Sequence, residues 1–195
     1  MTALSRLVAY VDESSTKRGN GTQEYLVCAT IIDVDAAERI REKLSSLRLP
    51  GQVKLHWTAE SDKRRRRIIA VIAGLEVAQV LIAHRSETDP RTERYRCKCL
   101  EQLYFELQQM EILDVILESR RPGQNTKDLE HIVALQNRGQ ATGIRLSHVR
   151  GGEEPLLWIP DAVLGAFNTR FFGQDEFWSA VCDCVTVLRS TPDSL

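Results

Sequence analysis

Long apolar runs are absent from this chain of 195 residues, which limits where the protein can reside. The longest purely apolar stretch, residues 68–73 followed by Gly74 and Leu75, is far shorter than the roughly 20 residues that span a bilayer. The amino-terminal segment has no apolar core before a small-residue cleavage site, because Arg6 interrupts its first apolar run. We therefore expect neither membrane insertion nor a secretory signal, and we expect a cytoplasmic protein.

Cysteine is scarce, and the five cysteines are odd in number. An odd count argues against a complete disulfide framework and agrees with a reducing compartment. Cys97 and Cys99, like Cys182 and Cys184, are two residues apart in helical-looking segments, where such residues point to different faces. This spacing disfavours a zinc site and favours buried, inert thiols.

Neither sign of charge dominates, since 26 Lys and Arg residues oppose 27 Asp and Glu residues. This balance excludes a disordered polyelectrolyte and a polycationic coat, so any surface for nucleic acid must be a local patch. The sequence has no P-loop, dinucleotide-binding, serine-hydrolase or zinc-protease motif, which leaves metal-dependent hydrolysis as the enzyme class. With 43% hydrophobic residues and no repeat or linker, the chain predicts a single domain over residues 1–195.

Periodicity and turn signals divide the chain into strands and helices. Residues 4–11 and 25–32 predict a hairpin, because both are rich in β-branched and aromatic residues and KRGNGTQ supplies a turn between them. An antiparallel hairpin followed by strands that alternate with helices predicts an α/β fold with a mixed sheet. We predict further strands at 76–83, 112–117 and 144–149, and helices at about 33–47, 58–73, 90–110, 125–139, 155–167 and 175–188.

Three acidic positions lie where predicted elements begin or end. Asp12 and Glu13 follow the run LVAYV, Glu118 follows ILDVIL, and Asp161 lies in an otherwise apolar helix start. If the first and fourth strands are neighbours, Asp12 and Glu118 lie side by side, and Asp161 closes the site from the last helix. Converging carboxylates repel unless a cation neutralises them, and oxygen ligands suit Mg²⁺ or Mn²⁺. Each acid alone has the alternative role of capping the next turn, but the trio favours a metal site.

Four segments together resemble a known family. AYVDESS at 9–15, KLHW at 54–57, VILESRR at 115–121 and WIPDAVLGAF at 158–167 resemble the bacterial domain-of-unknown-function family numbered 3800. That family opens with a strand ending Asp-Glu-Ser-Gly, has a later strand ending in an acid, and closes with a helix reading roughly Gln-x-x-Asp-x-x-x-Gly. The resemblance implies a ribonuclease H-like mixed sheet of five strands, flanked by helices, with a helical insertion at about 34–74.

The resemblance also implies roles for individual residues. Asp12 would be the central metal ligand, with Glu118 and Asp161 as the ligands from the fourth strand and the closing helix, and Glu13 as an auxiliary acid. His56 stands where the family often has His, and it would pass a proton to the leaving oxygen. A local hydrogen bond is its alternative role.

Basic residues near these acids are candidate phosphate contacts. Arg64 and Arg65 belong to KRRRR, the densest positive charge, and Arg120 and Arg121 follow the fourth strand. A solvated helix face is the alternative for KRRRR. Other candidates stay open: a fourth acid from Glu93, Glu101 or Glu106, and the pair Asp128 and His131, which alternatively forms a surface pair.

Two functional hypotheses follow. The first is a nuclease that hydrolyses phosphodiesters of RNA or DNA through two Mg²⁺ or Mn²⁺ ions. The second is a non-catalytic interaction or nucleic-acid-binding module of a defence or mobile-element system, whose site has drifted. Ser15 in place of the usual Gly, Pro160, and Glu118 in place of a common Asp motivate the second. Convergence of the carboxylates separates the two, and the sequence leaves a homodimer open.

Overall fold

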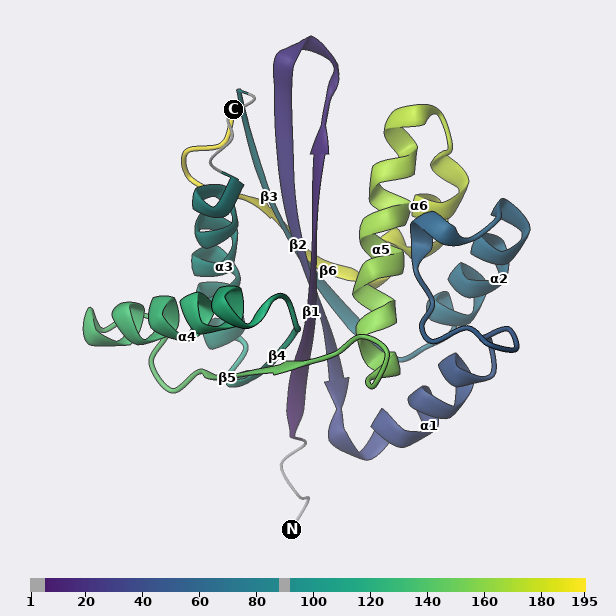
Figure 1. Cartoon of the computed structure of the whole chain (residues 1–195), viewed down its shortest axis with the longest axis horizontal. Coiled ribbons are helices and arrows are strands. Elements are labelled where there is room, and N and C mark those ends of the chain that lie inside the picture. Colours follow the sequence, from purple (N-terminus) through teal and green to yellow (C-terminus); the bar gives the residue numbers. More distant parts are fainter. Residues whose placement is uncertain (1–5, 88–91) are drawn as a thin grey trace.

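The computed structural model describes residues 6–87 and 92–195. Within these ranges six strands form one sheet in the order β5-β4-β1-β2-β3-β6, with helices on both faces (Figure 1). The strands are β1 (Leu7–Lys17), β2 (Thr22–Asp33), β3 (Ala78–Glu87), β4 (Asp114–Glu118), β5 (Arg145–Val149) and β6 (Val185–Ser190). The helices are α1 (Val34–Ser45), α2 (Asp62–Ala73), α3 (Thr92–Gln109), α4 (Pro122–Asn137), α5 (Trp158–Thr169) and α6 (Asp175–Val181).

The predicted mixed sheet is confirmed. β1, β2 and β3 pair in antiparallel fashion, whereas β4 pairs parallel to β1 and β5 pairs parallel to β4. The helices α1 and α2 lie between β2 and β3 in the chain, where the helical insertion at 34–74 is predicted. The first and fourth strands are therefore neighbours, as the predicted site requires.

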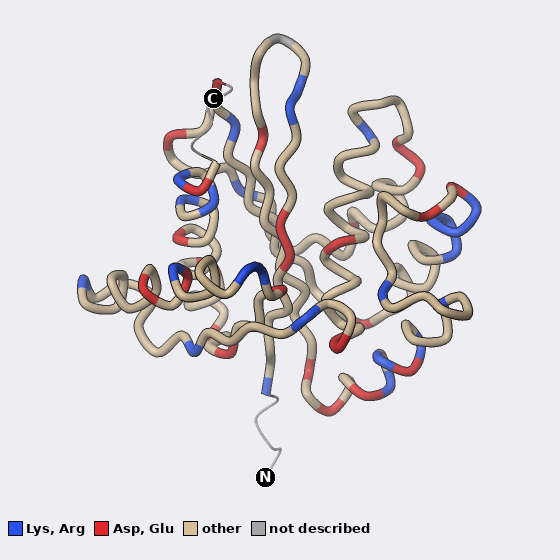
Figure 2. The backbone as a smooth tube through the Cα atoms, in the orientation of Figure 1, with Lys and Arg blue, Asp and Glu red and all other residues tan. Residues whose placement is uncertain are grey.

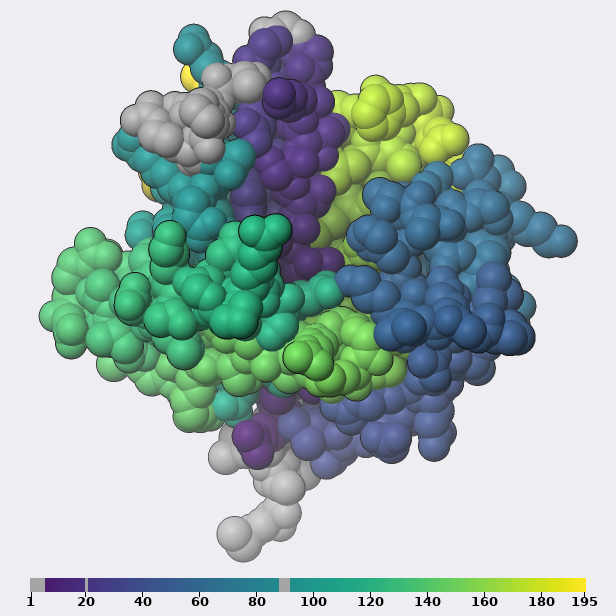
Figure 3. All heavy atoms as spheres, viewed as in Figure 1, coloured from purple at the N-terminus to yellow at the C-terminus, as the bar shows by residue number. Residues whose placement is uncertain are grey.

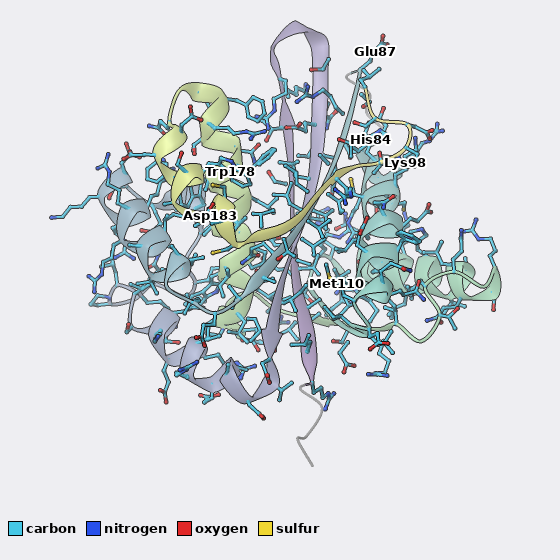
Figure 4. All side chains as sticks on the ribbon, turned by 180° about the vertical axis from the view of Figure 1, so that it is seen from behind. His84, Glu87, Lys98, Met110, Trp178 and Asp183 are labelled. Carbon is cyan, nitrogen blue, oxygen red and sulfur yellow. The ribbon has the colours of Figure 1, made fainter. Side chains whose placement is uncertain are left out.

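The carboxyl-terminal segment differs from the helix predicted over 175–188. The helix α6 ends at Val181, and residues 185–190 form β6, which pairs parallel to the outer edge of β3. In Figure 4 this strand crosses the back of the molecule from the side of Asp183 toward that of His84 and Lys98. The β-branched run Val185-Thr186-Val187 favours a strand, and pairing covers the backbone edge of β3. The described sheet therefore has six strands, one more than the five predicted.

Three other boundaries move. β1 continues through Asp12 and Glu13 to Lys17, so the two acids lie inside a strand and not at its end. α2 begins at Asp62, four residues later than predicted, because residues 57–59 form a 3₁₀ turn. Pro90, which is predicted to open α3, lies outside the described residues.

Each face of the sheet has its own apolar core, because side chains alternate along a strand. Val8 and Tyr10 of β1 pack in the core on the side of α1, α2 and α5, whereas Ala9 and Val11 pack in the core on the side of α3 and α4. The same alternation directs Asp12 toward α5. None of the helices in the described ranges is long and apolar enough to cross a membrane.

Candidate active site

The three predicted metal ligands lie on one face of the sheet. Val11 of β1 is opposite Leu117 of β4 in the parallel pair, so Asp12 and Glu118 are the next residues along neighbouring strands. Glu118 alternates with Ile116, which packs on the core shared with α5, so it points to that same face. Asp161 comes from the first turn of α5. Three elements far apart in the sequence thus bring their acids together.

Asp12 lies at the base of this arrangement. Its Oδ1 accepts a hydrogen bond from the backbone N–H of Glu13 at 2.8 Å. Burial raises the pKa of Asp12 well above its usual range, and Asp161 and then Glu118 raise that pKa further. The charge of Asp12 is therefore opposed by both other acids, as expected of a carboxylate cluster without a shared cation.

Lys54 supplies a positive charge to this cluster. Its Nζ donates to Oε1 of Glu118 at 2.6 Å. Burial lowers the pKa of Lys54, but Glu118, followed by Asp12 and Asp161, raises it above its ordinary value. The ammonium group therefore interacts favourably with all three acids.

Asp161 is held by the segment that follows Lys54. One carboxylate oxygen accepts from the backbone N–H of Trp57 at 2.8 Å, and the other is 3.2 Å from Nδ1 of His56. Asp161 raises the pKa of His56, whose side chain is 48% exposed. Gly165 allows this contact, because a Cβ there would lie 2.1 Å from Cγ of Trp57. α5 can therefore pack directly on Trp57.

The donor set suits a hard cation but does not form a ready-made coordination shell. Nowhere in the described part of the chain do three carboxylate, histidine or cysteine side chains adopt an arrangement that could hold a metal ion. Lys54 and His56 instead contact two of the acids, and the Lys54 ammonium acts as a stand-in cation. Carboxylate oxygens are ligands that Mg²⁺ and Mn²⁺ prefer, so the residues fit such an ion once these two contacts open.

Glu13 lies apart from the other predicted acids. It alternates with Asp12 and faces α3, where Arg96 Nε donates to its carboxylate. Arg96, only 3% exposed, also binds Asp128 of α4. Glu13 therefore belongs to an ion-pair network on the opposite face of the sheet.

Asp128 is the centre of that network. It accepts from Arg120 Nη2 at 2.9 Å and contacts His148 Nε2 at 2.9 Å, in addition to its two bonds from Arg96. Burial raises the pKa of Asp128, but His148 and the two arginines outweigh burial and lower it. His131, its predicted partner, instead contacts Glu101 at 3.0 Å. Asp128 thus has a buried role, and His131 is in a pair at the surface.

The predicted phosphate contacts have different surroundings. Arg64 binds Glu60 and the carbonyl oxygen of Leu47, so its guanidinium is used within the fold. Arg120 binds Glu93 as well as Asp128. These ion pairs compete with phosphate, which weakens the prediction for both arginines.

Two predicted arginines stay closer to solvent. Arg65 lines a cavity with Asp161 and His56, although it also binds Asp62 and the carbonyl oxygen of Trp57. Arg121 precedes α4 and is exposed. Of the candidates for a fourth acid, Glu93 contacts Arg120, Glu101 contacts His131 and Glu106 contacts Gln102, so none of them joins the trio.

The sequence interpretation missed two contributors. Lys54 lies in KLHW, only two residues before His56, but the histidine alone was considered. A lysine beside three predicted acids was the available signal. Arg96 gave none, because nothing in the helical pattern of α3 distinguishes a buried arginine from an exposed one.

Comparisons with known proteins agree with the topology. No family model and no curated protein sequence matches the chain. A chain in the structure of the PCNA:RNase HII complex from Archaeoglobus fulgidus matches with a TM-score of 0.52 and 15% identity, over 90% of this chain and 79% of that one. Bst-RNase HIII, as a mutant and in complex with Mn²⁺, matches with TM-scores of 0.36, 13% and 12% identity, over 87% and 85% of this chain and 56% of each structure. The last two scores are too low to support an argument. The fold is ribonuclease H-like, and at 15% identity the likeness extends to the fold alone.

Proposed function

We propose that this chain is a metal-dependent nuclease that hydrolyses phosphodiester bonds, with Asp12, Glu118 and Asp161 as the ligands of divalent cations. The observation that supports this proposal is the gathering of three acids from β1, β4 and α5 on one face of a ribonuclease H-like sheet. Membership of the family numbered 3800 is part of the same proposal, and it rests on the four motifs quoted above.

Each residue of the site would have a separate task. Bound Mg²⁺ or Mn²⁺ would supply activation of a water molecule and stabilisation of the leaving oxygen. Asp12 and Glu118 are fixed by paired strands, so their spacing is set by the sheet. His56 is half-exposed and oriented by Asp161, which suits it to give a proton to the leaving oxygen. Lys54 would contact a phosphate oxygen once it leaves Glu118.

The test is cleavage by the purified protein with Mg²⁺ or Mn²⁺. The substrates are single-stranded and double-stranded RNA and DNA and an RNA–DNA hybrid. Asp12→Asn and Asp161→Asn should each lower the rate by orders of magnitude, because each removes a ligand carboxylate. Asp114→Asn is the matched control, since Asp114 lies at the other end of β4 and pairs with Arg6 and Arg145. Cleavage that survives in both site variants contradicts the proposal.

A second candidate function is a nucleic-acid-binding module without catalysis. The contacts of Lys54 with Glu118 and of His56 with Asp161 favour it, because they neutralise the acids without a metal. The same assay separates the candidates. Binding of nucleic acid with no cleavage by the wild-type protein in either ion would support the module.

A further inference from the structure

Two cavities join the candidate active site to the tip of the β1–β2 hairpin. One, of about 360 Å³, is lined by Asp161, His56 and residues 13–16 of β1. The other, of about 510 Å³, is lined by residues 17–19. They share Phe172, and β1 runs from one into the other without interruption. We call these two cavities together the hairpin track.

Positive charge gathers at the outer end of the hairpin track. Arg18 Nε donates to Oε2 of Glu24 at 3.0 Å, and Arg85 Nη2 donates to Oε1 of the same buried carboxylate at 2.9 Å. Lys17 is exposed and forms no ion pair with another described residue. In Figure 2 basic segments lie on the hairpin and on the strand beside it. Three cations around one carboxylate leave this end of the track positive.

Two arginine donors here are not used within the described structure. The Arg18 side chain is 9% exposed, yet its Nη1 has no hydrogen-bond partner among the residues described, and Nε of Arg85 has none either. Buried donors are normally satisfied, so unpaired guanidinium nitrogens beside a cavity favour an anionic ligand. Guanidinium groups bind phosphate through such donors.

Aromatic rings accompany these cations. The guanidinium carbon of Arg18 is 3.9 Å and that of Arg170 is 4.8 Å from the ring centroid of Phe171, which fixes this ring between two cations. Phe172 is different, because it is 73% exposed and contacts no other ring or guanidinium within the described residues. It lies where the two cavities meet. An exposed phenyl ring beside phosphate-binding groups suits stacking on a nucleobase.

We propose that the hairpin track binds a single-stranded segment of nucleic acid that extends from the candidate active site, with Phe172 stacked on an unpaired base and Lys17, Arg18 and Arg85 contacting phosphates. A paired base offers its face only at a duplex end, so stacking on Phe172 selects unpaired nucleotides. In the face seen in Figure 3, the hairpin is exposed along its length and stands beside the segment that follows α5. This inference rests on the proposed function in taking the ligand to be the polymer that the site cuts.

The test measures binding without metal, so that cleavage plays no part. Fluorescence anisotropy in EDTA compares labelled 12-nucleotide single-stranded DNA and RNA with the matching blunt duplexes. The wild-type protein should bind the single strands more tightly than the duplexes. Phe172→Ala should weaken single-strand binding by about 5- to 10-fold, the low end of the range for loss of one base stack. Phe172→Trp should restore binding, and Lys17→Gln should reduce its dependence on salt.

Phe105→Ala is the matched control, because Phe105 is an exposed phenylalanine of α3 that lines neither cavity. It should bind like the wild type. A preference for duplex, no single-strand binding, or equal binding by the wild type and Phe172→Ala would overturn the inference. Failure of the proposed function shows instead as absent cleavage with Mg²⁺ and Mn²⁺, while single-strand binding in EDTA is retained.

Discussion

Asp12 is a carboxyl whose surroundings oppose its charge. Its pKa is raised by burial, Asp161 and Glu118, so the folded protein holds this proton more tightly than the unfolded chain. The free energy of unfolding must then fall as pH rises from about 4, the unfolded value, through the raised pKa. Asp12→Asn cannot lose that proton. Its stability relative to wild type should therefore increase with pH, by about 1.4 kcal/mol for each unit by which the pKa is raised.

Urea denaturation between pH 4 and pH 8, without divalent ions, measures this difference. Asp114→Asn is a control of opposite sign, because Arg145 and then Arg6 lower the pKa of Asp114. The contribution of Asp114 is present above the unfolded pKa of about 4 and is lost as pH falls through the folded pKa. The difference for Asp114→Asn should stay constant from pH 5 to pH 8. Parallel stability curves for wild type and Asp12→Asn would show that Asp12 does not feel its neighbours.

Asp128 is predicted to matter for stability more than its place in the sequence indicates. Asp128→Asn should lower the free energy of unfolding by about 3 kcal/mol, because it leaves the buried Arg96 with an uncompensated charge. Glu101→Gln breaks only the exposed contact with His131 and should change stability by about 0.5 kcal/mol or less. Urea denaturation at pH 7 gives both values. Equal effects would mean that the network around Asp128 is no stronger than a surface pair.

At the level of elements, the turn after β5 brings its backbone against Glu118. A Cβ at Gly151 would lie 2.5 Å from Glu118 Oε1, whereas one at Gly152 would lie 2.8 Å from Val53 Cγ1. Gly151→Ala should displace the flexible Glu118 carboxylate at a cost in stability of about 1 kcal/mol or less. It should also reduce the increase in melting temperature that Mn²⁺ causes. Gly152→Ala, which touches no acid, should retain the full increase, and thermal melts with and without Mn²⁺ compare the two.

The element pattern of the sequence carried most of the topology. The apolar runs that end at Val11 and Leu117 predicted two strands whose acids meet if the strands pair, and β1 and β4 do pair in that register. β6 was missed because its six residues follow a short helix directly, and their helical and strand periodicities are hard to separate over so short a run. Its state is decided by the free edge of β3, which is a tertiary contact.

The site itself was predictable where it depends on strands and less so where it depends on loops. Period-two alternation could have placed Glu13 on the face opposite Asp12, had the strand been extended beyond residue 11. The approach of Lys54 to Glu118 spans 64 residues and comes from a segment without regular structure, so no periodicity reports it. Gly165 is a partial exception. The spacing Asp-x-x-x-Gly of the resembled family includes it, and the structure shows why a side chain is excluded there.

The whole molecule should register metal binding as stability, since a cation that binds only the folded state stabilises it by RT ln(1 + [L]/Kd). At a hundredfold excess over Kd this is about 2.7 kcal/mol, a melting shift of roughly 5 to 10 °C for a domain of this size. In the wild type the ion must first displace Lys54 from Glu118. Lys54→Met should therefore melt about 2 to 4 °C lower than wild type without metal, since a partly exposed pair contributes about 1 kcal/mol or less.

With saturating Mn²⁺ the two proteins should melt at nearly the same temperature, because the ion then neutralises the acids in both. The shift should thus be larger in Lys54→Met, by the amount that its metal-free form has lost. Lys43→Met removes an equal charge from the exposed surface of α1 and should shift like the wild type. Melting curves of all three proteins that do not respond to millimolar Mn²⁺ would mean that the acids bind no divalent ion. In that case the lysine is the permanent counterion of the cluster, and the fold would be serving as a binding module.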